Sequence, residues 1–470
     1  MTAYPDFRGK KVTVVGLGIE GVDLVRYLAA QGAQVTASDA RTAGQLTRRL
    51  QELNGVPVRL SLGQNAVADT ESADAVFVSQ GVPLDIPALQ AARESGVPIS
   101  SMTRLFLELC PGPVVGITGS SGKTTTTGLV GAMFAAAARP NAVGGNIGLG
   151  LLGLLDHLTP ETWVVAEISH TQLELTDRSP HVACVLNVTP NHLDRYSWDG
   201  YVALKRRILA FQGAGDLAVL NYENEVTRGM AGDARSEVLF FALAAEPPGD
   251  GAFLRDGSVV CRRGGRETAV VAASDVPLRG RHNLANVVAA TAVGAACDLP
   301  PSAMASAVRA FRAAPHRLEL VADVKGVAYY NDSIATTPER TLAGLRSFEE
   351  PVVVLLGGRE KHLPLEEMAA EACRRCRAAV VFGEAAPVLE EALRAAAGRI
   401  APEKRPQVLK AGTLAEAVDA ASGAARLGDV VLLSPACTSF DAFENFERRG
   451  EEFRRLVVEL SPASGGLGGQ

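Results

Sequence analysis

Short runs of β-branched residues alternate with longer Ala- and Leu-rich segments of helical period along nearly the whole chain. This alternation is typical of α/β folds, in which helices connect parallel strands. At 470 residues, and with ~150 residues per domain, the chain should form about three domains. The pattern restarts after the turn at 110–113 and again near 313–315. We therefore expect domains at 1–109, 110–313 and 314–470.

Each block contains several predicted strands. The first block has them at 12–15, 34–38, 75–79 and 98–100, the second at 114–118, 163–168 and 182–187, and the third at 327–330, 352–356, 379–382 and 430–434. The stretch 225–276 mixes Gly, Asp and Arg with short β runs, which predicts peripheral strands and loops.

The composition excludes several classes of protein. Lys and Arg total 46 and Asp and Glu total 52, so a net charge of −6 offers no bulk attraction for nucleic acid or an anionic membrane. No apolar run reaches the ~18 residues of a membrane span, and the N-terminus lacks the apolar core of a secretory signal. Seven scattered Cys residues fit reduced thiols. We expect a cytoplasmic protein without nucleic acid partners or membrane insertion.

A first glycine motif, Gly16-x-Gly18-x-x-Gly21, follows a predicted strand and opens a predicted helix. Asp39 ends the next strand. In this context backbone amides at a helix N-terminus hold a diphosphate, and the acidic side chain reaches a ribose or base. The motif predicts a nucleotide-like ligand, although glycines for a tight turn and close packing are the alternative. Taken alone, it would favour a dinucleotide oxidoreductase.

A second glycine-rich loop covers 119–124 between the strand at 114–118 and an Ala-rich helix. Its amides and Lys123 would neutralise the β- and γ-phosphates of a nucleotide, and Thr124 would bind Mg²⁺. Ile117 stands where the longer Walker pattern has its first glycine, so the match is to a shorter form. The flanking elements make a chance loop the weaker alternative, and we predict an ATP site.

Candidate catalytic side chains follow the next strands. Glu167 closes the strand at 163–168, where a carboxylate is suited to Mg²⁺ beside phosphates. His192 lies in a loop after 182–187; an isolated loop histidine is usually a surface residue, but the company of Lys123 and Glu167 favours a role here. Lys205 follows on a predicted helix, and sequence physics alone favours an exposed lysine.

Further polar loops follow strands or open helices, where ligands of α/β sheets bind. They lie at 144–148, 280–286, 316–317, 331–333, 357–361 and 434–441. The two Asn side chains of 280–286, at positions i and i+3, share one helix face. These loops are predicted to hold substrates.

The chain resembles the Mur ligase family over nearly its whole length. The segments that carry the resemblance are TGSSGKTTT (118–126), GGNIG (144–148), NVTPNHLDRY (187–196), GRHNLANV (280–287), PHR (315–317), NDS (331–333) and SPACTSFDAFENFERRGEEF (434–453). The last segment is most similar to the branch that adds D-glutamate to UDP-N-acetylmuramoyl-L-alanine. The resemblance implies a Rossmann-like UDP-binding domain, a central P-loop-type ATPase domain and a C-terminal Rossmann-like α/β domain. It also implies ATP and Mg²⁺ as cofactors, an acyl-phosphate intermediate, a monomer, and a place in peptidoglycan precursor synthesis.

The resemblance further implies roles for individual residues. Those for the UDP-sugar are Gly18, Ile19, Glu20, Asp39, Arg41 and Gly81, with Asn146 and His192 toward the muramoyl-alanine end. Those for ATP are Gly119, Ser120, Ser121, Gly122, Lys123, Thr124, Thr125, Asn283, Asn286, Arg317 and Asp332. Mg²⁺ would be held by Thr124, Glu167, His192 and Lys205, the last as a carbamate; Lys123, Glu167, His192 and Lys205 would be catalytic. Glutamate would be surrounded by Thr336, Lys361, Ser439, Phe440 and Phe446.

Four positions differ from the usual pattern of that branch. After Glu167 the usual S-S-F/Y-Q-L reads Ser169-His170-Thr171-Gln172-Leu173 here. Ile334 stands in place of a usual lysine, Phe440 in place of a leucine, and Gln80 in place of a proline. Arg359, two residues from Lys361, is expected to supply the missing cation because its planar fork suits a carboxylate.

Three other functions stay open. A ligase for another amino acid, such as L-glutamate, would use the same loops. An NAD-dependent oxidoreductase would explain the first glycine motif but not Lys123. A P-loop switch or motor would explain Lys123 but neither Asp39 nor the segment 434–453.

Overall fold

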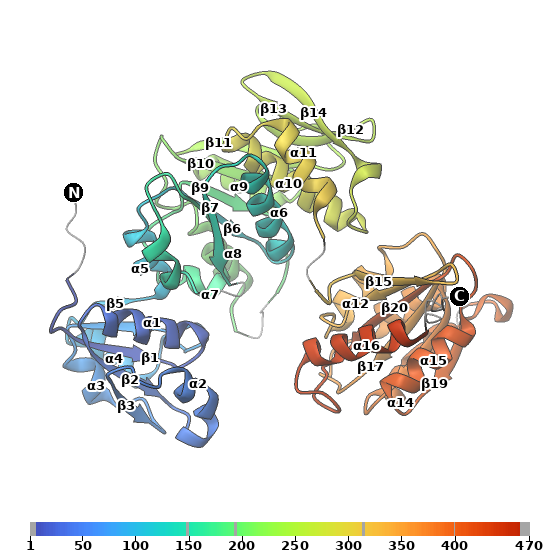
Figure 1. Ribbon diagram of the computed structural model, residues 1–470, viewed down its shortest axis with the longest axis horizontal. Helices are drawn as coiled ribbons and strands as arrows, with labels where there is room; N and C mark the ends of the chain where they lie inside the picture. Colours follow the sequence, from blue (N-terminus) through green and yellow to red (C-terminus); the bar gives the residue numbers. More distant parts are fainter. Residues whose placement is uncertain (1–5, 147–149, 192–194, 313–314, 399, 461–470) are drawn as a thin grey trace, which may run out of the picture. The chain divides into compact units, whose positions relative to one another are not determined.

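The computed structural model describes residues 6–146, 150–191, 195–312, 315–398 and 400–460 (Figure 1). The chain divides into two compact units, of which one comprises Met1–Val276 and Ala285–Phe311 and the other Pro277–Leu284 and Arg312–Gln470. Within the described residues the first unit contains two sheets and the second unit one. The predicted α/β class is confirmed.

The N-terminal sheet is parallel throughout. Its spatial order is β3 (Val58–Leu62), β2 (Gln34–Asp39), β1 (Lys11–Val15), β4 (Ala75–Val78) and β5 (Ile99–Ser100). Its helices are α1 (Ile19–Ala30), α2 (Thr47–Glu52), α3 (Val67–Glu71), α4 (Pro87–Glu94) and α5 (Met102–Leu109). In β1 every residue after Lys11 is buried, as expected for a central strand covered on both faces.

The second sheet carries the phosphate loop. Its spatial order is β14 (Arg266–Ala272), β13 (Ser258–Arg263), β12 (Gly251–Arg255), β11 (Glu237–Ala242), β10 (Leu217–Asn221), β9 (Val182–Val185), β6 (Val114–Thr118), β8 (Trp163–Glu167) and β7 (Asn141–Gly145). Neighbours from β7 to β12 are parallel, whereas β13 and β14 extend the sheet as antiparallel strands. The expectation of peripheral strands in 225–276 is therefore confirmed.

Helices of this second part are α6 (Lys123–Ala136), α7 (His170–Leu173), α8 (Trp198–Arg206), α9 (Glu225–Met230), α10 (Arg281–Ala296) and α11 (Pro301–Ala310). The first residues of α10, 281–284, group with the second unit. Among the described residues, no helix is both long and apolar enough to cross a bilayer.

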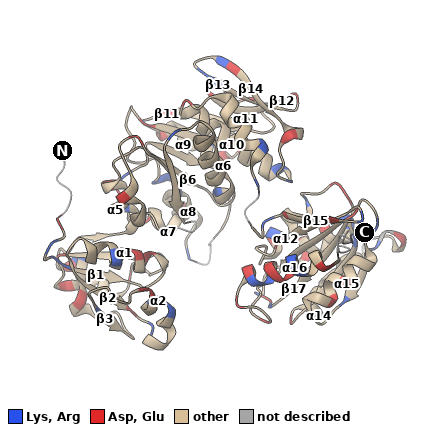
Figure 2. Ribbon diagram, in the orientation of Figure 1, with Lys and Arg blue, Asp and Glu red and all other residues tan. Residues whose placement is uncertain are grey.

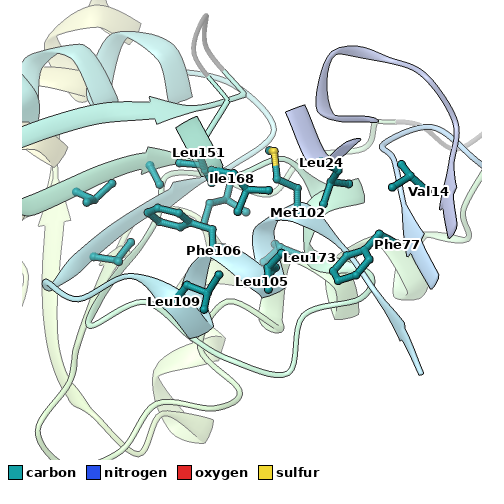
Figure 3. Close-up of a cluster of buried hydrophobic side chains, with 14 of the residues drawn as sticks. Val14, Leu24, Phe77, Met102, Leu105, Phe106, Leu109, Leu151, Ile168 and Leu173 are labelled. Atoms are coloured by element: carbon teal, nitrogen blue, oxygen red, sulfur yellow. The ribbon is translucent and has the colours of Figure 1, made fainter. Parts of the chain in front are cut away.

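One hydrophobic cluster continues from the N-terminal sheet into the second sheet of the same unit. Helix α5 lies in the middle of it, since Phe106 and Met102 are buried between Val14 and Phe77 on one side and Ile168 on the other (Figure 3). Ile168 follows β8 directly, so this core supports the end of the strand that carries Glu167.

The sheet of the second unit has the spatial order β15 (Glu319–Val324), β16 (Val327–Asn331), β20 (Val430–Ala436), β17 (Val352–Gly357), β18 (Cys376–Phe382) and β19 (Gln407–Lys410). All neighbours are parallel except β15 and β16. Its helices are α12 (Pro338–Leu345), α13 (Glu366–Arg375), α14 (Ala386–Ala397), α15 (Leu414–Ala424) and α16 (Phe446–Leu460).

Helix α16 shows how sequence pattern decides burial in this unit. Acidic and basic residues occur together along this helix (Figure 2). The exposed Arg455 pairs with Glu452 and Glu459. One face of the helix buries Phe453 and Val457 against the sheet. The apolar stripe thus fixes the helix and leaves its N-terminal end beside the loops that follow β20.

Candidate active site

The loop at 119–122 joins the fully buried strand β6 to helix α6, as predicted. Gly122 caps the helix with a φ of 82°, and a Cβ there would collide with Asn286 Oδ1. Only glycine fits both the left-handed backbone and this close approach. Asn286, predicted as an ATP contact, therefore lies directly against the phosphate loop.

Two lysines contact the same loop carbonyl. Lys123 Nζ donates to Gly119 O at 3.0 Å, and Lys205 Nζ donates to Gly119 O at 3.2 Å and to Thr118 Oγ1 at 3.0 Å. The Lys205 side chain comes from α8 and is only 1% exposed, so the expectation of a surface lysine is wrong. Burial, together with the charge of Lys123, holds the pKa of Lys205 well below its usual range.

Glu167 lies beside this pair at the carboxyl end of β8, and it is 2% exposed. Its Oε2 accepts a hydrogen bond from Thr124 Oγ1 at 2.8 Å, and its Oε1 accepts one from Asn146 Nδ2 at 2.9 Å. The order β9, β6, β8, β7 in the sheet brings these residues to one edge. A carboxylate and a hydroxyl oxygen form the hard donor set that Mg²⁺ prefers, so these residues fit that ion.

The loop after β9 fixes the phosphate loop from the other side. Ser120 N donates to Asn187 O at 2.9 Å and Ser121 N to Asn187 Oδ1 at 3.0 Å. The hydroxyl groups of Ser120 and Tyr201 are 3.2 Å apart. Sequence reasoning gave Asn187 and Tyr201 no role, although Asn187 opens one of the segments quoted above. His192 lies outside the described residues, so its predicted role is neither supported nor opposed by geometry.

The first glycine motif forms the expected strand–turn–helix. A Cβ on Gly21 would overlap Gly16 O, so the third glycine lets α1 approach the turn closely. Asp39 accepts from Leu17 N at 2.7 Å and from Arg41 Nη2 at 2.8 Å. Burial would raise the pKa of Asp39, but these bonds, chiefly from Arg41, hold it below its ordinary value.

The other predicted UDP-sugar residues surround this turn. Gly18 caps α1, Ile19 is 63% exposed on its first turn, and Gly81 follows β4 with a φ of 86°. Glu20 accepts from Gln80 N at 3.2 Å and from Gln172 Nε2 at 2.6 Å, and burial raises its pKa.

Asp332 lies in the second unit just after β16. Its Oδ2 accepts from Ser434 Oγ at 2.9 Å and its Oδ1 from Leu318 N at 3.2 Å. Burial raises the pKa of Asp332, and the hydrogen bond from Ser434 lowers it by less, so that the resulting pKa is about 7. Of the remaining predicted ATP contacts, Asn283 donates to Arg279 O at 2.7 Å, Arg317 is half-buried before Leu318, and Thr125 is buried in α6.

The predicted amino-acid residues occupy loops after β16, β17 and β20, which are neighbours in the sheet. Lys361 Nζ donates to Thr336 Oγ1 at 3.3 Å. Ser439 is buried, Phe440 is 59% exposed, and Phe446 opens α16. Arg359 instead donates to both carboxylate oxygens of Glu384, at 2.8 and 2.9 Å.

Arg449, which sequence reasoning missed, connects these three loops. It is 1% exposed and donates to Ser333 Oγ and O at 3.0 Å, to Cys437 O at 3.1 Å, and to Gly357 O at 3.3 Å. Arg449 lies in an Arg-Arg-Gly motif on a highly charged helix, a pattern typical of an exposed helix face. No feature of the sequence shows that Arg449 is buried and Arg448 is not.

Comparisons with known proteins decide the family. The profile of the Mur ligase MurD-like N-terminal domain matches residues 10–101, that of the Mur ligase middle domain 117–294, and that of the Mur ligase glutamate ligase domain 316–437. The chain belongs to the Mur ligase family. Members are ATP-dependent amide ligases, so this protein is an enzyme of that class.

Individual relatives agree over the full length. The UDP-N-acetylmuramoylalanine–D-glutamate ligase of Symbiobacterium thermophilum is 42% identical, over 96% of this chain and 98% of its own length. The enzyme of the same name from Acetivibrio thermocellus is 39% identical, over 96% and 97%. The solved structure of UDP-N-acetylmuramate-alanine ligase MurC from Thermotoga maritima, at 19% identity and a TM-score of 0.60, shares the Mur ligase fold over 96% of this chain and 99% of its own.

Proposed function

We propose that this enzyme adds D-glutamate to UDP-N-acetylmuramoyl-L-alanine at the expense of ATP, in the cytoplasmic synthesis of peptidoglycan precursors. The observation that carries the proposal is the convergence of Lys123, Lys205 and Glu167 at the phosphate loop. The relatives that match the chain end to end carry that activity in their names. We propose a monomer as the active form.

The chemistry begins with two anions that must meet. A carboxylate oxygen of the UDP-sugar attacks the γ-phosphorus of ATP, the bond to the β-phosphate breaks, and ADP leaves an acyl phosphate behind. The amides of 119–122 and Lys123 neutralise the charge on the transferring group. The glutamate amine then attacks the acyl carbon, loses a proton, and displaces inorganic phosphate to leave an amide.

Mg²⁺, when bound, would spread the charge of the phosphates. Glu167 and Thr124 are the residues that would hold it, with His192 and a carbamate of Lys205 as further ligands. The lowered pKa of Lys205 supports the carbamate, because a neutral amine is the form that reacts with carbon dioxide. Asn146 fixes the Glu167 carboxylate and would face the alanyl end of the UDP-sugar.

The remaining predicted contacts with the substrates are assigned here for each unit by itself. Gly18, Ile19, Glu20, Asp39, Arg41 and Gly81 would bind the uridine diphosphate at the edge where β1 and β2 end. Asn283, Asn286, Arg317 and Asp332 would complete the ATP site. Thr336, Lys361, Ser439, Phe440 and Phe446 would bind the glutamate.

A phosphate-release assay tests the proposal by omission. The purified enzyme with ATP and Mg²⁺ should release phosphate only when UDP-N-acetylmuramoyl-L-alanine and D-glutamate are both present. Equal or faster turnover with L-glutamate would favour the other enantiomer. Release without any amino acid would favour a P-loop ATPase, and hydride transfer to NAD would favour an oxidoreductase.

A further inference from the structure

The loop that follows β16 carries no cation of its own between Asp332 and Thr336, where Ile334 is its central residue. A substrate with two carboxylates needs positive charge around it, and Lys361 is a single cation. The question is which other side chain supplies the second charge.

Arg340 on the first turn of α12 reaches back over this loop. Its Nη1 donates to Ile334 O at 3.3 Å. A cation near a helix N-terminus is opposed by the helix dipole, so helix stability does not account for an arginine here. Among the described residues, no carboxylate lies within ion-pair distance of Arg340.

Lys361 approaches the same loop from the end of β17. Its Nζ donates to Thr336 Oγ1, two residues from the carbonyl that Arg340 contacts. Lys361 also has no carboxylate partner within the part of the chain that the structure describes. Partial burial and then the charge of Arg340 lower its pKa, so the two cations repel each other. Such a pair is stabilised when an anion binds between them.

Arg359, expected from sequence to supply the charge, has a different partner. Both branches of its guanidinium bind the carboxylate of Glu384. A second carboxylate would have to displace that partner. Arg340 faces no such competition.

We propose that Arg340, together with Lys361, binds a carboxylate of the incoming glutamate at the loop that both side chains contact. The inference rests on the proposed function and deepens it. Arg340 is therefore a residue that determines affinity for a dicarboxylic amino acid, while other side chains bind the UDP-sugar and ATP.

Steady-state kinetics on the purified full-length enzyme tests this. Arg340→Ala should raise the KM for D-glutamate at least ~10-fold, the loss expected for one charge-assisted hydrogen bond, while the KM for UDP-N-acetylmuramoyl-L-alanine changes less than about twofold. The KM of Arg340→Lys for D-glutamate should lie between those of the wild type and Arg340→Ala. Arg346→Ala, at the C-terminal cap of the same helix and paired with Glu367, is the matched control and should behave as wild type.

The double variant Ile334→Lys/Arg340→Ala separates charge from structure. It restores a cation without restoring the hydrogen bond to the carbonyl of residue 334, so it should recover most of the lost glutamate affinity. An unchanged KM for glutamate in Arg340→Ala, or a parallel rise in all three KM values without recovery in the double variant, would overturn the inference alone. A wild-type enzyme without glutamate-dependent turnover would overturn the proposed function and the inference with it.

Discussion

Burial decides the charge state of several ionisable side chains in this enzyme. Lys205 illustrates this, because its helix looks like an ordinary exposed one in the sequence, yet the side chain lies under the phosphate loop. A buried, charged lysine next to another lysine destabilises the fold unless its amine becomes neutral or is converted into an anion. A carbamate would convert this repulsive cation into an anion beside Lys123, and it would be one of the groups that could hold Mg²⁺.

Lys205→Ala is therefore expected to abolish ligation, and bicarbonate should not restore it because no amine remains. Short carboxylic acids such as acetate should recover part of the activity by supplying oxygens in the emptied space. The rate of amide formation with increasing acetate measures this. Full activity of Lys205→Ala without any acid would return the residue to a purely structural role.

Asp332 predicts a pH dependence of stability. Its pKa of about 7 in the fold lies above the ordinary value of 3.8, so the folded state keeps a proton that the unfolded state releases. Its contribution is fully present below about pH 4 and is lost as the pH rises through about 7. The free energy of unfolding of wild type, relative to Asp332→Asn, should fall across that window in urea titrations. Parallel pH profiles of the two proteins would contradict the assignment.

Among the helices and strands, the buried strands and the polar loops that follow them could be predicted from the sequence. Strands without a continuous apolar run could not. β6, β8 and β20 are continuous β-branched or apolar runs and were predicted to within a few residues. The sequence did not predict β7, because Asn141–Gly145 contains two glycines and no continuous apolar run. It lies at the edge of the sheet beside β8. Helix α13 ends at Arg375 and β18 begins at once with Cys376, a boundary that the sequence does not mark with a Gly or Pro.

The partners of individual side chains in the loops could not be predicted. The order of strands and loops places Glu167 and Thr124 at one edge of the sheet, but it could not show that Glu384 binds Arg359 or that Arg340 contacts residue 334. Those pairs depend on side-chain directions that only the folded loops define.

The turn into α6 provides a test at this scale. Gly122→Ala should weaken ATP binding at least ~10-fold and destabilise the fold by about 1–3 kcal/mol, because its left-handed backbone and the contact with Asn286 both exclude a Cβ. Gly229→Ala in α9, where a Cβ meets nothing within 4 Å, is the matched control and should be neutral or slightly stabilising. Calorimetric titration with ATP and urea unfolding measure both effects; equal behaviour of the two variants would refute the argument.

In the whole molecule, the candidate residues lie on three sheets, two in the first unit and one in the second. Each sheet presents polar loops at the carboxyl ends of its parallel strands, which is where such folds bind ligands. We therefore expect the binding of the UDP-sugar and the binding of ATP to depend on different sheets.

Lys123→Ala tests this division. Ligation should be lost, because the phosphate loop loses its main cation, while UDP-N-acetylmuramoyl-L-alanine should still bind at the turn of the separate N-terminal sheet. Calorimetry with each ligand distinguishes the two sites, and circular dichroism checks that the variant is folded. Loss of both binding events in a folded variant would show that the sites are not separate.

We expect this enzyme to make its amide through an acyl phosphate formed on the UDP-sugar. The most direct measurement uses UDP-N-acetylmuramoyl-L-alanine with ¹⁸O in its free carboxylate, ATP, Mg²⁺ and D-glutamate, followed by mass spectrometry of the inorganic phosphate. One ¹⁸O atom should appear in each phosphate released, in step with the glutamyl product. Phosphate free of ¹⁸O, or ¹⁸O-labelled phosphate without any glutamyl product, would contradict the account.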